Sequence, residues 1–212
     1  MNRATFFLEW SKLHGDAKTI GIVRAWLSVS YILAKPFAVL RISPNALSYS
    51  TIGLGILYVL YIESNFAILF LLLTLFFDGI DGSVALMSNK VSKFGALLDS
   101  LADRVVEALW ILGLFLLGAP WQSLTLIWVG IYIQEYMRAR SSSIGITDIL
   151  IITWCERPVR ASIIFIFLVA RAIGFSEDVF LSLVTYIWLV LQLSSAFKLF
   201  LILRLHLQQS QR

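Results

Sequence analysis

The stretch FFDGIDGSVALMSNKVSKFGALLDSLADRVVE, residues 76–107, decides the fold because it sets four aspartates within apolar sequence. These aspartates are Asp78, Asp81, Asp99 and Asp103. On insertion scales, a charged side chain at the centre of a bilayer costs about 2.5–3.5 kcal/mol, so carboxylates persist there only when other groups compensate them. If the surrounding sequence is embedded in a membrane, four neighbouring carboxylates therefore require cations.

The composition indicates a membrane protein. Hydrophobic residues make up 59% of the 212 residues and charged residues only 14%, whereas about a quarter of a soluble domain is charged. Apolar runs of spanning length recur with short breaks, which predicts an all-α integral membrane protein formed by one domain over residues 1–212. We expect six transmembrane helices, at about 45–62, 66–88, 92–118, 121–142, 158–174 and 178–204.

The N-terminal segment, residues 1–41, differs from these runs. Phe6, Phe7, Trp10 and Leu13 recur at helical spacing among basic residues, which predicts a helix lying in the membrane interface. The alternative is a short solvated lead-in. Residues 1–20 mix charged and apolar side chains, a pattern not typical of a cleaved signal peptide. Because Cys155 is the single cysteine, no disulfide can form within the chain.

Basic residues alternate with the order of the connections. They gather in residues 1–41, at Lys90 and Lys93, between 138 and 160, and near the C-terminus, while the intervening connections hold only Arg171. By the positive-inside rule, this alternation predicts six spans with both termini cytoplasmic. The hairpin of residues 76–107 would then open to the cytoplasm from a multi-pass protein of the cell membrane.

The aspartate spacings favour a metal site. Asp78 and Asp81 are three residues apart, and Asp99 and Asp103 four apart, so each pair lies on one face of its helix. A set of oxygen ligands without histidine or cysteine suits Mg²⁺ or Mn²⁺. Glycines at 79, 82 and 95 would let a ligand approach closely. The alternative is that the aspartates pair with Arg104, Lys90 and Lys93.

This segment resembles the signature of the CDP-alcohol phosphatidyltransferases, D-x₂-D-G-x₂-A-R-x₈-G-x₃-D-x₃-D. Every spacing agrees, and seven of the eight defined positions match, at Asp78, Asp81, Gly82, Ala85, Gly95, Asp99 and Asp103, with Leu86 in place of the arginine. Because Leu86 replaces a cation, a contact to the diphosphate is missing, for which Lys90 or Lys93 is a candidate substitute. A slow or inactive member of the family is the alternative.

The resemblance implies transfer from a CDP-linked lipid with release of CMP. It implies that Asp78, Asp81, Asp99 and Asp103 hold two divalent ions on the diphosphate, and that Asp103 is the catalytic base toward the acceptor hydroxyl. Five residues are expected to contact the nucleotide diphosphate: Asn45, Ser48, Gly82, Ala85 and Gly95. For Asn45 the alternative is a helix cap. The resemblance also implies a homodimer, and no nucleic-acid partner is expected.

A second set of patterns bears on the acceptor. Tyr136-Met137-Arg138-Ala139-Arg140 and Glu156-Arg157-Pro158-Val159-Arg160 resemble the Y-x-[KR]-A-R and E-R-P-x-R patterns of the phosphatidylinositol phosphate synthase branch, and Arg204-Leu205-His206 resembles its R-L-H. That branch joins CDP-diacylglycerol to inositol 1-phosphate. The resemblance implies that Arg138, Arg157, Arg160 and Arg204 bind the acceptor phosphate. The alternative is that these arginines are positive-inside anchors on membrane lipids.

Three functions remain open from the sequence. The favoured one is transfer of a phosphatidyl group from CDP-diacylglycerol to inositol 1-phosphate. Its nearest rival is a phosphatidylglycerophosphate synthase or another member of the same family, whose phosphorylated acceptor would also attract arginines. The third is a non-catalytic membrane protein that binds or transports metal, which the clustering of charges near one membrane face disfavours.

Overall fold

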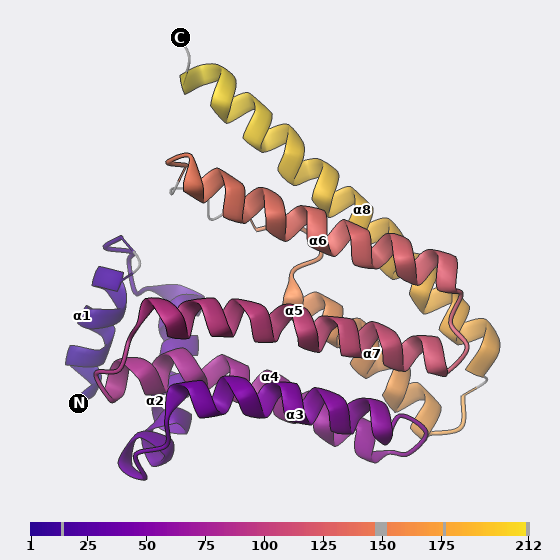
Figure 1. The fold of residues 1–212 in the computed structure, drawn as a ribbon, viewed down its shortest axis with the longest axis horizontal. Helices are drawn as coiled ribbons and strands as arrows, with labels where there is room; N and C mark the ends of the chain where they lie inside the picture. Colours follow the sequence, from indigo (N-terminus) through magenta and orange to yellow (C-terminus); the bar gives the residue numbers. More distant parts are fainter. Residues whose placement is uncertain (14, 147–151, 176, 211–212) are drawn as a thin grey trace. The chain divides into compact units, whose positions relative to one another are not determined.

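The secondary structure of the described residues is entirely α-helical, as the apolar sequence predicts (Figure 1). The computed structural model describes residues 1–13, 15–146, 152–175 and 177–210. Its helices are α1 Arg3–Leu13, α2 Gly21–Val39, α3 Pro44–Leu60, α4 Phe66–Met87, α5 Lys93–Leu116, α6 Trp121–Ser143, α7 Arg157–Ala172 and α8 Glu177–Ser210. The helices expected from the sequence correspond to α3 through α8. Their ends agree to within two residues, except that α8 continues to Ser210.

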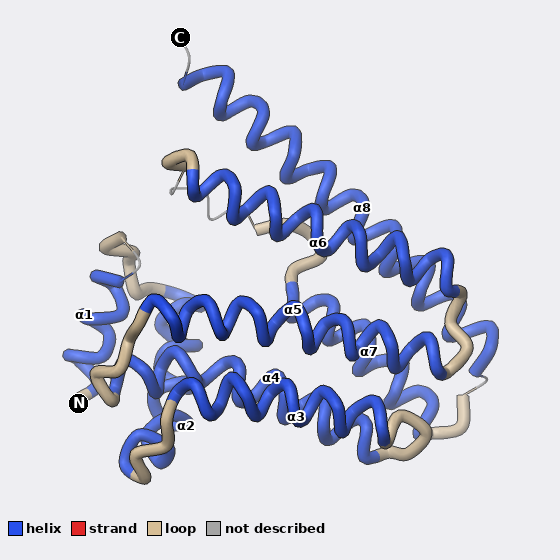
Figure 2. The backbone as a smooth tube through the Cα atoms, in the orientation of Figure 1, coloured by secondary structure: helices blue, strands red, loops and turns tan. Residues whose placement is uncertain are grey.

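Short loops and turns connect many of the helices (Figure 2), and several helices begin or end at residues that favour turns. Asn89 after α4 has a φ of 54°, and Gly118 after α5 has a φ of 93°. These are left-handed conformations, which asparagine and glycine adopt more readily than other residues. Pro44 is the first residue of α3, and Pro158 lies in the first turn of α7, where the missing N–H has no helical partner to lose. Local sequence thus explains most of the boundaries.

Two described helices are long and apolar enough to cross a membrane, namely α4 and the part of α8 from Val179 to Gln208. A third span results if Val23–Val39 and Pro44–Leu60, which are bent by 106°, are taken together. The prediction of six spans is therefore not confirmed. Helix α7 has 16 residues and a length of about 24 Å, against a hydrocarbon core of about 30 Å. Helices α5 and α6 carry charged residues within their length.

The chain divides into two compact units. The first unit contains Met1–Leu60 and Leu69–Leu109, and the second contains Tyr61–Ile68 and Trp110–Arg212. The first therefore holds α1, α2, α3 and most of α4 and α5, while the second holds α6, α7 and α8.

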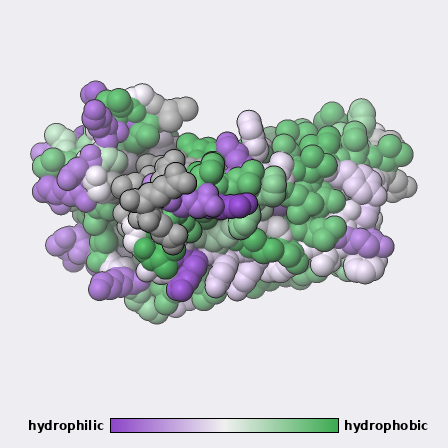
Figure 3. Space-filling model, turned by 90° about the horizontal axis from the view of Figure 1, so that it is seen from above, coloured by the Kyte–Doolittle hydropathy of each residue, from purple (hydrophilic) through white to green (hydrophobic). Residues whose placement is uncertain are grey.

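Each unit has its own packing. In the first, Ala34, Leu47, Ile80 and Val84 form a buried apolar cluster that joins α2, α3 and α4. In the second, α6 packs along α8, and α7 also contacts α8. Hydrophobic side chains remain at the surface over much of the face in Figure 3. Val190, for example, is 67% exposed, which suits a surrounding lipid.

Candidate active site

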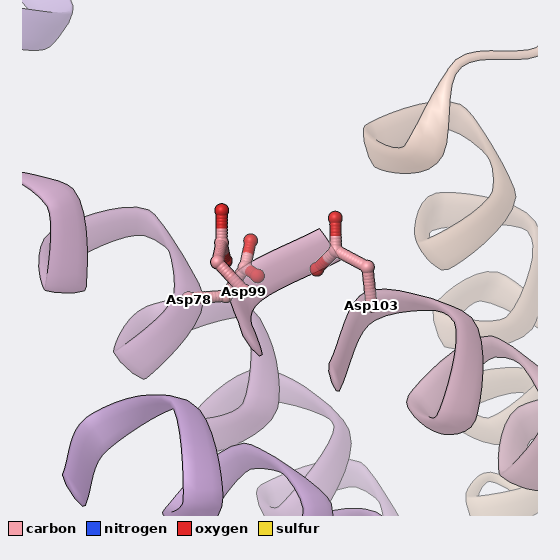
Figure 4. A group of neighbouring side chains, drawn as sticks. All are labelled: Asp78, Asp99 and Asp103. Atoms are coloured by element: carbon pink, nitrogen blue, oxygen red, sulfur yellow. The ribbon is translucent and has the colours of Figure 1, made fainter. Parts of the chain in front are cut away.

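Three of the four signature aspartates meet where α4 and α5 lie together. One carboxylate oxygen from each of Asp78, Asp99 and Asp103 lies within 4.8 Å of the other two. Figure 4 shows the three side chains gathered on one side of the ribbons that carry them. At an effective dielectric constant of 20, two unit charges at this separation repel by about 3 kcal/mol. The cluster is therefore an environment that a cation stabilises.

The donor set fits a hard divalent ion. Its three ligands are carboxylate oxygens, and all three side chains are partly exposed. Mg²⁺ in proteins is commonly bound by one or two carboxylates together with substrate phosphates and waters. Three partly exposed carboxylates could therefore hold an ion and leave coordination positions open to a substrate.

Asp81 lies outside this group of three. It is 7% exposed, and each of its oxygens accepts a hydrogen bond: Oδ2 from the Ser48 hydroxyl at 2.7 Å and Oδ1 from the backbone N–H of Gly82 at 2.6 Å. Asp81 thereby connects α4 to α3. In this arrangement, its carboxylate stabilises the wall beside the cluster.

The sequence also allowed the aspartates to pair with basic residues of the chain, and Arg104 supports this alternative in part. Its guanidinium lies 3.1 Å from the carboxylate of Glu107 and 3.7 Å from that of Asp103. Glu107 is 1% exposed, so this ion pair is buried. Arg104 therefore offsets charge along α5 at one end of the aspartate cluster.

A cavity of about 310 Å³ opens beside the carboxylates, within the first unit. Its lining includes three of the signature aspartates and all five residues expected to contact the nucleotide diphosphate: Asp78, Asp81, Asp99, Asn45, Ser48, Gly82, Ala85 and Gly95. A Cβ added at Gly82 would meet no atom within 4 Å, so a side chain there would project into open space. Lys90 lines this cavity, whereas Lys93 is not among its lining residues.

The remainder of the cavity wall was not predicted from the sequence. Trp10 and Leu13 of α1 and Trp26 and Leu27 of α2 line it beside the polar residues. Trp26 lies so close to α4 that a Cβ added at Gly79 would be 3.1 Å from the indole ring. The apolar spacing in residues 1–41 predicted an interfacial helix, but that pattern does not say that a cavity lies beneath it.

Leu86, the departure from the family signature, also belongs to this wall. Its side chain is 7% exposed and lies in a buried apolar cluster with Phe6 of α1 and Leu27 of α2. The position that carries an arginine in the signature is thus an apolar packing position in this chain.

All four predicted acceptor-binding arginines lie in the second unit, and three of them contact neighbouring groups of that unit. Arg138 donates to the Glu156 carboxylate at 2.5 Å, and the Arg157 guanidinium lies 5.6 Å from the centre of the Trp110 ring. Arg160 is fully buried. Its Nε donates to the Cys155 carbonyl at 2.9 Å and to Gln192 Oε1 at 3.2 Å.

The fourth, Arg204, is placed in different surroundings. It lines a groove of about 380 Å³ between α6 and α8, together with Arg140. The remaining lining residues are largely apolar: Tyr136, Met137, Ser141, Ile144, Phe200, Leu203, Leu207 and Gln208. Arg204 is exposed, in contrast to Arg160.

Further polar residues around Arg160 were missed by the sequence interpretation. Gln192 Nε2 donates to Gln134 Oε1 at 2.9 Å, and Gln134 Nε2 donates to the Thr153 hydroxyl at 3.1 Å. Both glutamines are fully buried, and Glu135 accepts from Arg160 at 3.4 Å. An amide within an apolar helix is the signal that could have identified them, because a buried polar group requires a hydrogen-bond partner.

Cys155 is a packing residue in this structure. Its side chain is fully buried, and burial raises the pKa of the thiol to about 11. A thiol with this pKa stays protonated at neutral pH and is a poor nucleophile.

A family comparison identifies the class of protein. The sequence model of the CDP-alcohol phosphatidyltransferase family matches residues 41–203, which contain all four signature aspartates. The chain belongs to this family. It is accordingly an enzyme of phospholipid synthesis, acting on a CDP-linked lipid and an alcohol.

Individual relatives refine this assignment. The chain is 35% identical over 161 residues to the archaetidylinositol phosphate synthase of Pyrococcus horikoshii, covering 73% of this chain and 85% of that protein. It is 33% identical over 87 residues to the Aeropyrum pernix protein of the same name, covering 41% and 45%. It is also 40% identical over 73 residues to a CDP-diacylglycerol–serine O-phosphatidyltransferase of Helicobacter pylori, covering 33% and 31%.

These similarities also decide between classes of function. The family and the apolar helices indicate a membrane protein, and the aspartate cluster provides a place for the divalent metal that the family uses. They support an enzyme over the non-catalytic metal-binding protein considered from the sequence.

Proposed function

We propose that this enzyme transfers a phosphatidyl group from CDP-diacylglycerol to a hydroxyl of inositol 1-phosphate and releases CMP. The observation that carries the proposal is the convergence of Asp78, Asp99 and Asp103 beside a cavity lined by the other signature residues. The choice of acceptor is supported by the similarity to archaetidylinositol phosphate synthases over most of the chain.

The donor would be held by its diphosphate. Asn45 and Ser48 would supply polar contacts from the start of α3, while Gly82, Ala85 and Gly95 would let the cytidine diphosphate lie against the helices. Bound Mg²⁺ or Mn²⁺, with two ions expected at Asp78, Asp81, Asp99 and Asp103, would offset charge on the diphosphate and on the departing CMP. Asp81 would exchange its present hydrogen bonds to take part.

Asp103 would act as the general base. Its carboxylate would take the proton from the acceptor hydroxyl as the hydroxyl oxygen bonds to the phosphorus of the phosphatidyl group. The bond from that phosphorus to the oxygen bridging to CMP would break, and CMP would leave with the bonding electron pair. The side chain of Asp103 is 22% exposed, so it is accessible to a substrate.

The acceptor phosphate would be bound by arginines of the second unit. Arg138, Arg157 and Arg160 belong to the two branch patterns, and guanidinium groups recognise phosphate through paired hydrogen bonds. Glu156 would orient Arg138 through the 2.5 Å contact between them. Arg204 enters this proposal only through its resemblance to the R-L-H pattern.

The proposed setting in the membrane is supported by the charges of the connections and by the family resemblance. We propose a multi-pass protein of the cell membrane with six spans and both termini in the cytoplasm, because the basic connections alternate. The active site would face the cytoplasm, because the basic connection that holds Lys90 and Lys93 lies beside it, and the protein would form a homodimer.

The test is a panel of acceptors with the purified protein, Mg²⁺ and CDP-diacylglycerol. Inositol 1-phosphate, glycerol 3-phosphate, serine and free inositol would be compared, scoring both CMP and lipid product. We expect inositol 1-phosphate to give the highest kcat/KM. A preference for glycerol 3-phosphate would instead favour a phosphatidylglycerophosphate synthase, and a preference for serine or free inositol would overturn the phosphorylated acceptor. The archaeol analogue of the donor would reveal any preference for ether lipids.

A variant sharpens the assignment of the acceptor site. Arg138→Ala should raise KM for inositol 1-phosphate more than it lowers kcat, because the lost contact acts on binding. The matched control is Arg24→Ala on α2, which also removes one cation but lies outside the branch patterns. Equal losses with free inositol and with inositol 1-phosphate would count against a phosphate pocket.

A further inference from the structure

Leu86 occupies an apolar contact between three helices. It lies on α4, while its two buried partners, Phe6 and Leu27, come from α1 and α2. Phe6 is completely buried and Leu27 is 2% exposed. An arginine at position 86 would have two outcomes. Its guanidinium would be buried in this cluster, which is strongly unfavourable for a charge among apolar side chains, or it would turn away and the contact with Phe6 and Leu27 would be lost. The packing of α1 against α4 therefore depends on an apolar residue at position 86.

Helix α1 is held on α2 by additional contacts. The Phe6 ring lies 5.4 Å from the Tyr31 ring, and the Tyr31 hydroxyl donates to the Met1 carbonyl at 3.0 Å. The Arg3 guanidinium donates to the Ser28 hydroxyl. These contacts attach α1 along α2. Leu86 is the buried residue of α4 in the cluster that holds Phe6 of α1, and the partly buried Met87 packs against the same cluster.

The docked helix contributes to the wall of the cavity. Trp10 packs against the cluster formed by Phe6, Leu27 and Leu86, and both Trp10 and Leu13 line the cavity that the aspartates also line. The cavity thus combines carboxylates and polar side chains with an aromatic and aliphatic surface. If α1 moved away, the part of the apolar wall that Trp10 and Leu13 form would be lost.

We propose that Leu86 is a positioning residue that docks α1 on α2 and α4 and so fixes the apolar wall which Trp10 and Leu13 give to the donor cavity. Position 86 then offers no cation to the diphosphate, whereas Lys90 lines the cavity. The apolar wall suits a donor that joins a charged diphosphate to apolar groups. Only this last step rests on the proposed function, because the docking of α1 is a property of the protein without substrate.

The docking is tested without substrate by limited trypsin digestion of the full chain in detergent. Lys12 lies in α1, and its cleavage reports how often α1 leaves its place. We expect Leu86→Arg to raise the cleavage rate at Lys12 by about tenfold or more, since proteolysis follows the population of the open form. Leu86→Met should stay near the wild-type rate. The matched control is Leu97→Arg, at an α5 position that is 66% exposed.

Unchanged cleavage at Lys12 in a folded Leu86→Arg protein would overturn the proposal. If that variant does not fold, Phe6→Ala removes the same contact from the side of α1 and should raise cleavage at Lys12. A folded Phe6→Ala protein that is cut no faster than the wild type would overturn it equally.

Kinetics test the consequence for the donor. Leu86→Arg should raise KM for CDP-diacylglycerol several-fold with little change in KM for the acceptor. Leu86→Met should keep KM for CDP-diacylglycerol near the wild-type value. A Leu86→Arg protein with a lower donor KM or a higher kcat would show instead that the chain merely lacks a cation, and would overturn the positioning role. Because the digestion uses no substrate, it decides the docking even if the proposed acceptor is wrong.

Discussion

Charged side chains are arranged in opposite ways in two parts of the molecule, the acidic cluster on α4 and α5 and the arginines on α6 and α7. The acidic cluster places three carboxylates within 4.8 Å of one another beside a cavity. The arginines each contact partners of their own. Arg138 contacts Glu156, and the fully buried Arg160 contacts a carbonyl, an amide and Glu135.

The difference shows which of the two groups of side chains a bound ligand would stabilise. Gathered like charges raise the free energy of the folded protein, so a site of this kind is stabilised by a cation from outside. A buried arginine with satisfied hydrogen bonds is stable without a ligand, and removing one partner is costly. Asp78 and its neighbours thus point to binding, whereas Arg160 has a structural role whether or not it also contacts an acceptor.

The largest effect is expected at the acidic cluster. Asp103→Asn keeps the size of the side chain but removes the base, and should lower kcat by about 10²–10⁴-fold with donor binding largely retained. The measurement is CMP release at saturating donor and acceptor. Asp16→Asn is the matched control, because Asp16 is exposed in the turn after α1. A loss in kcat of less than tenfold would remove Asp103 from the role of base.

The two clusters should respond oppositely in stability. In metal-free protein, Asp99→Asn relieves repulsion and should raise the free energy of unfolding, whereas Arg160→Gln should lower it by about 3 kcal/mol because Glu135 and Gln192 lose a buried partner. Thermal unfolding in one detergent compares both variants with the wild type. If both variants lost stability equally, the contrast between a strained cluster and a satisfied one would be wrong.

Space in the donor cavity provides a finer test. Gly82→Leu places a side chain where an added Cβ meets no atom within 4 Å, so the protein should fold normally. The donor must then compete with that side chain, and its KM should rise by about tenfold, equivalent to about 1.4 kcal/mol. Gly53→Leu is the control, because Gly53 has the same free space but does not line the cavity. Equal donor KM values in the two variants would show that the donor binds elsewhere.

The smallest effect concerns the arginine side of the comparison. Cys155 lies within the packed segment that Arg160 contacts, and its pKa of about 11 leaves about one thiol in a thousand ionised at pH 8. Maleimide labelling of the folded protein should therefore be very slow at pH 8 and should become rapid at the same pH in denaturant. Fast labelling of folded protein at pH 8 would mean that this segment opens readily.

The sequence predicted the helices, and it predicted that Asp99 and Asp103 lie close together, because both features depend on local spacing. Apolar runs and turn residues such as Asn89 are local signals, so the ends of α3 through α7 agree with the structure to within two residues. The spacing of Asp99 and Asp103 places them on one helix face without knowledge of the rest of the fold. The all-α class is confirmed on the same basis.

Other features depend on contacts distant in sequence and could not be predicted. Trp10 and Trp26 line the cavity only because α1 and α2 pack beside α4, and Arg204 lies in a groove because α6 and α8 run together. The role of Leu86 likewise depends on Phe6, eighty residues earlier in the chain. The number of spans was inferred from loop charge, whereas helix length and charge within the helices support two, or three with the bent pair.

The most direct test is equilibrium binding of Mn²⁺ to the purified protein, followed by electron paramagnetic resonance of the free ion. The wild type would be compared with a variant in which Asp78, Asp99 and Asp103 are all replaced by Asn, and with Asp16→Asn. The acidic cluster predicts saturable binding by the wild type and by Asp16→Asn, and loss of that binding in the triple variant. Binding by the folded triple variant that equals binding by the wild type would contradict a metal site at these aspartates.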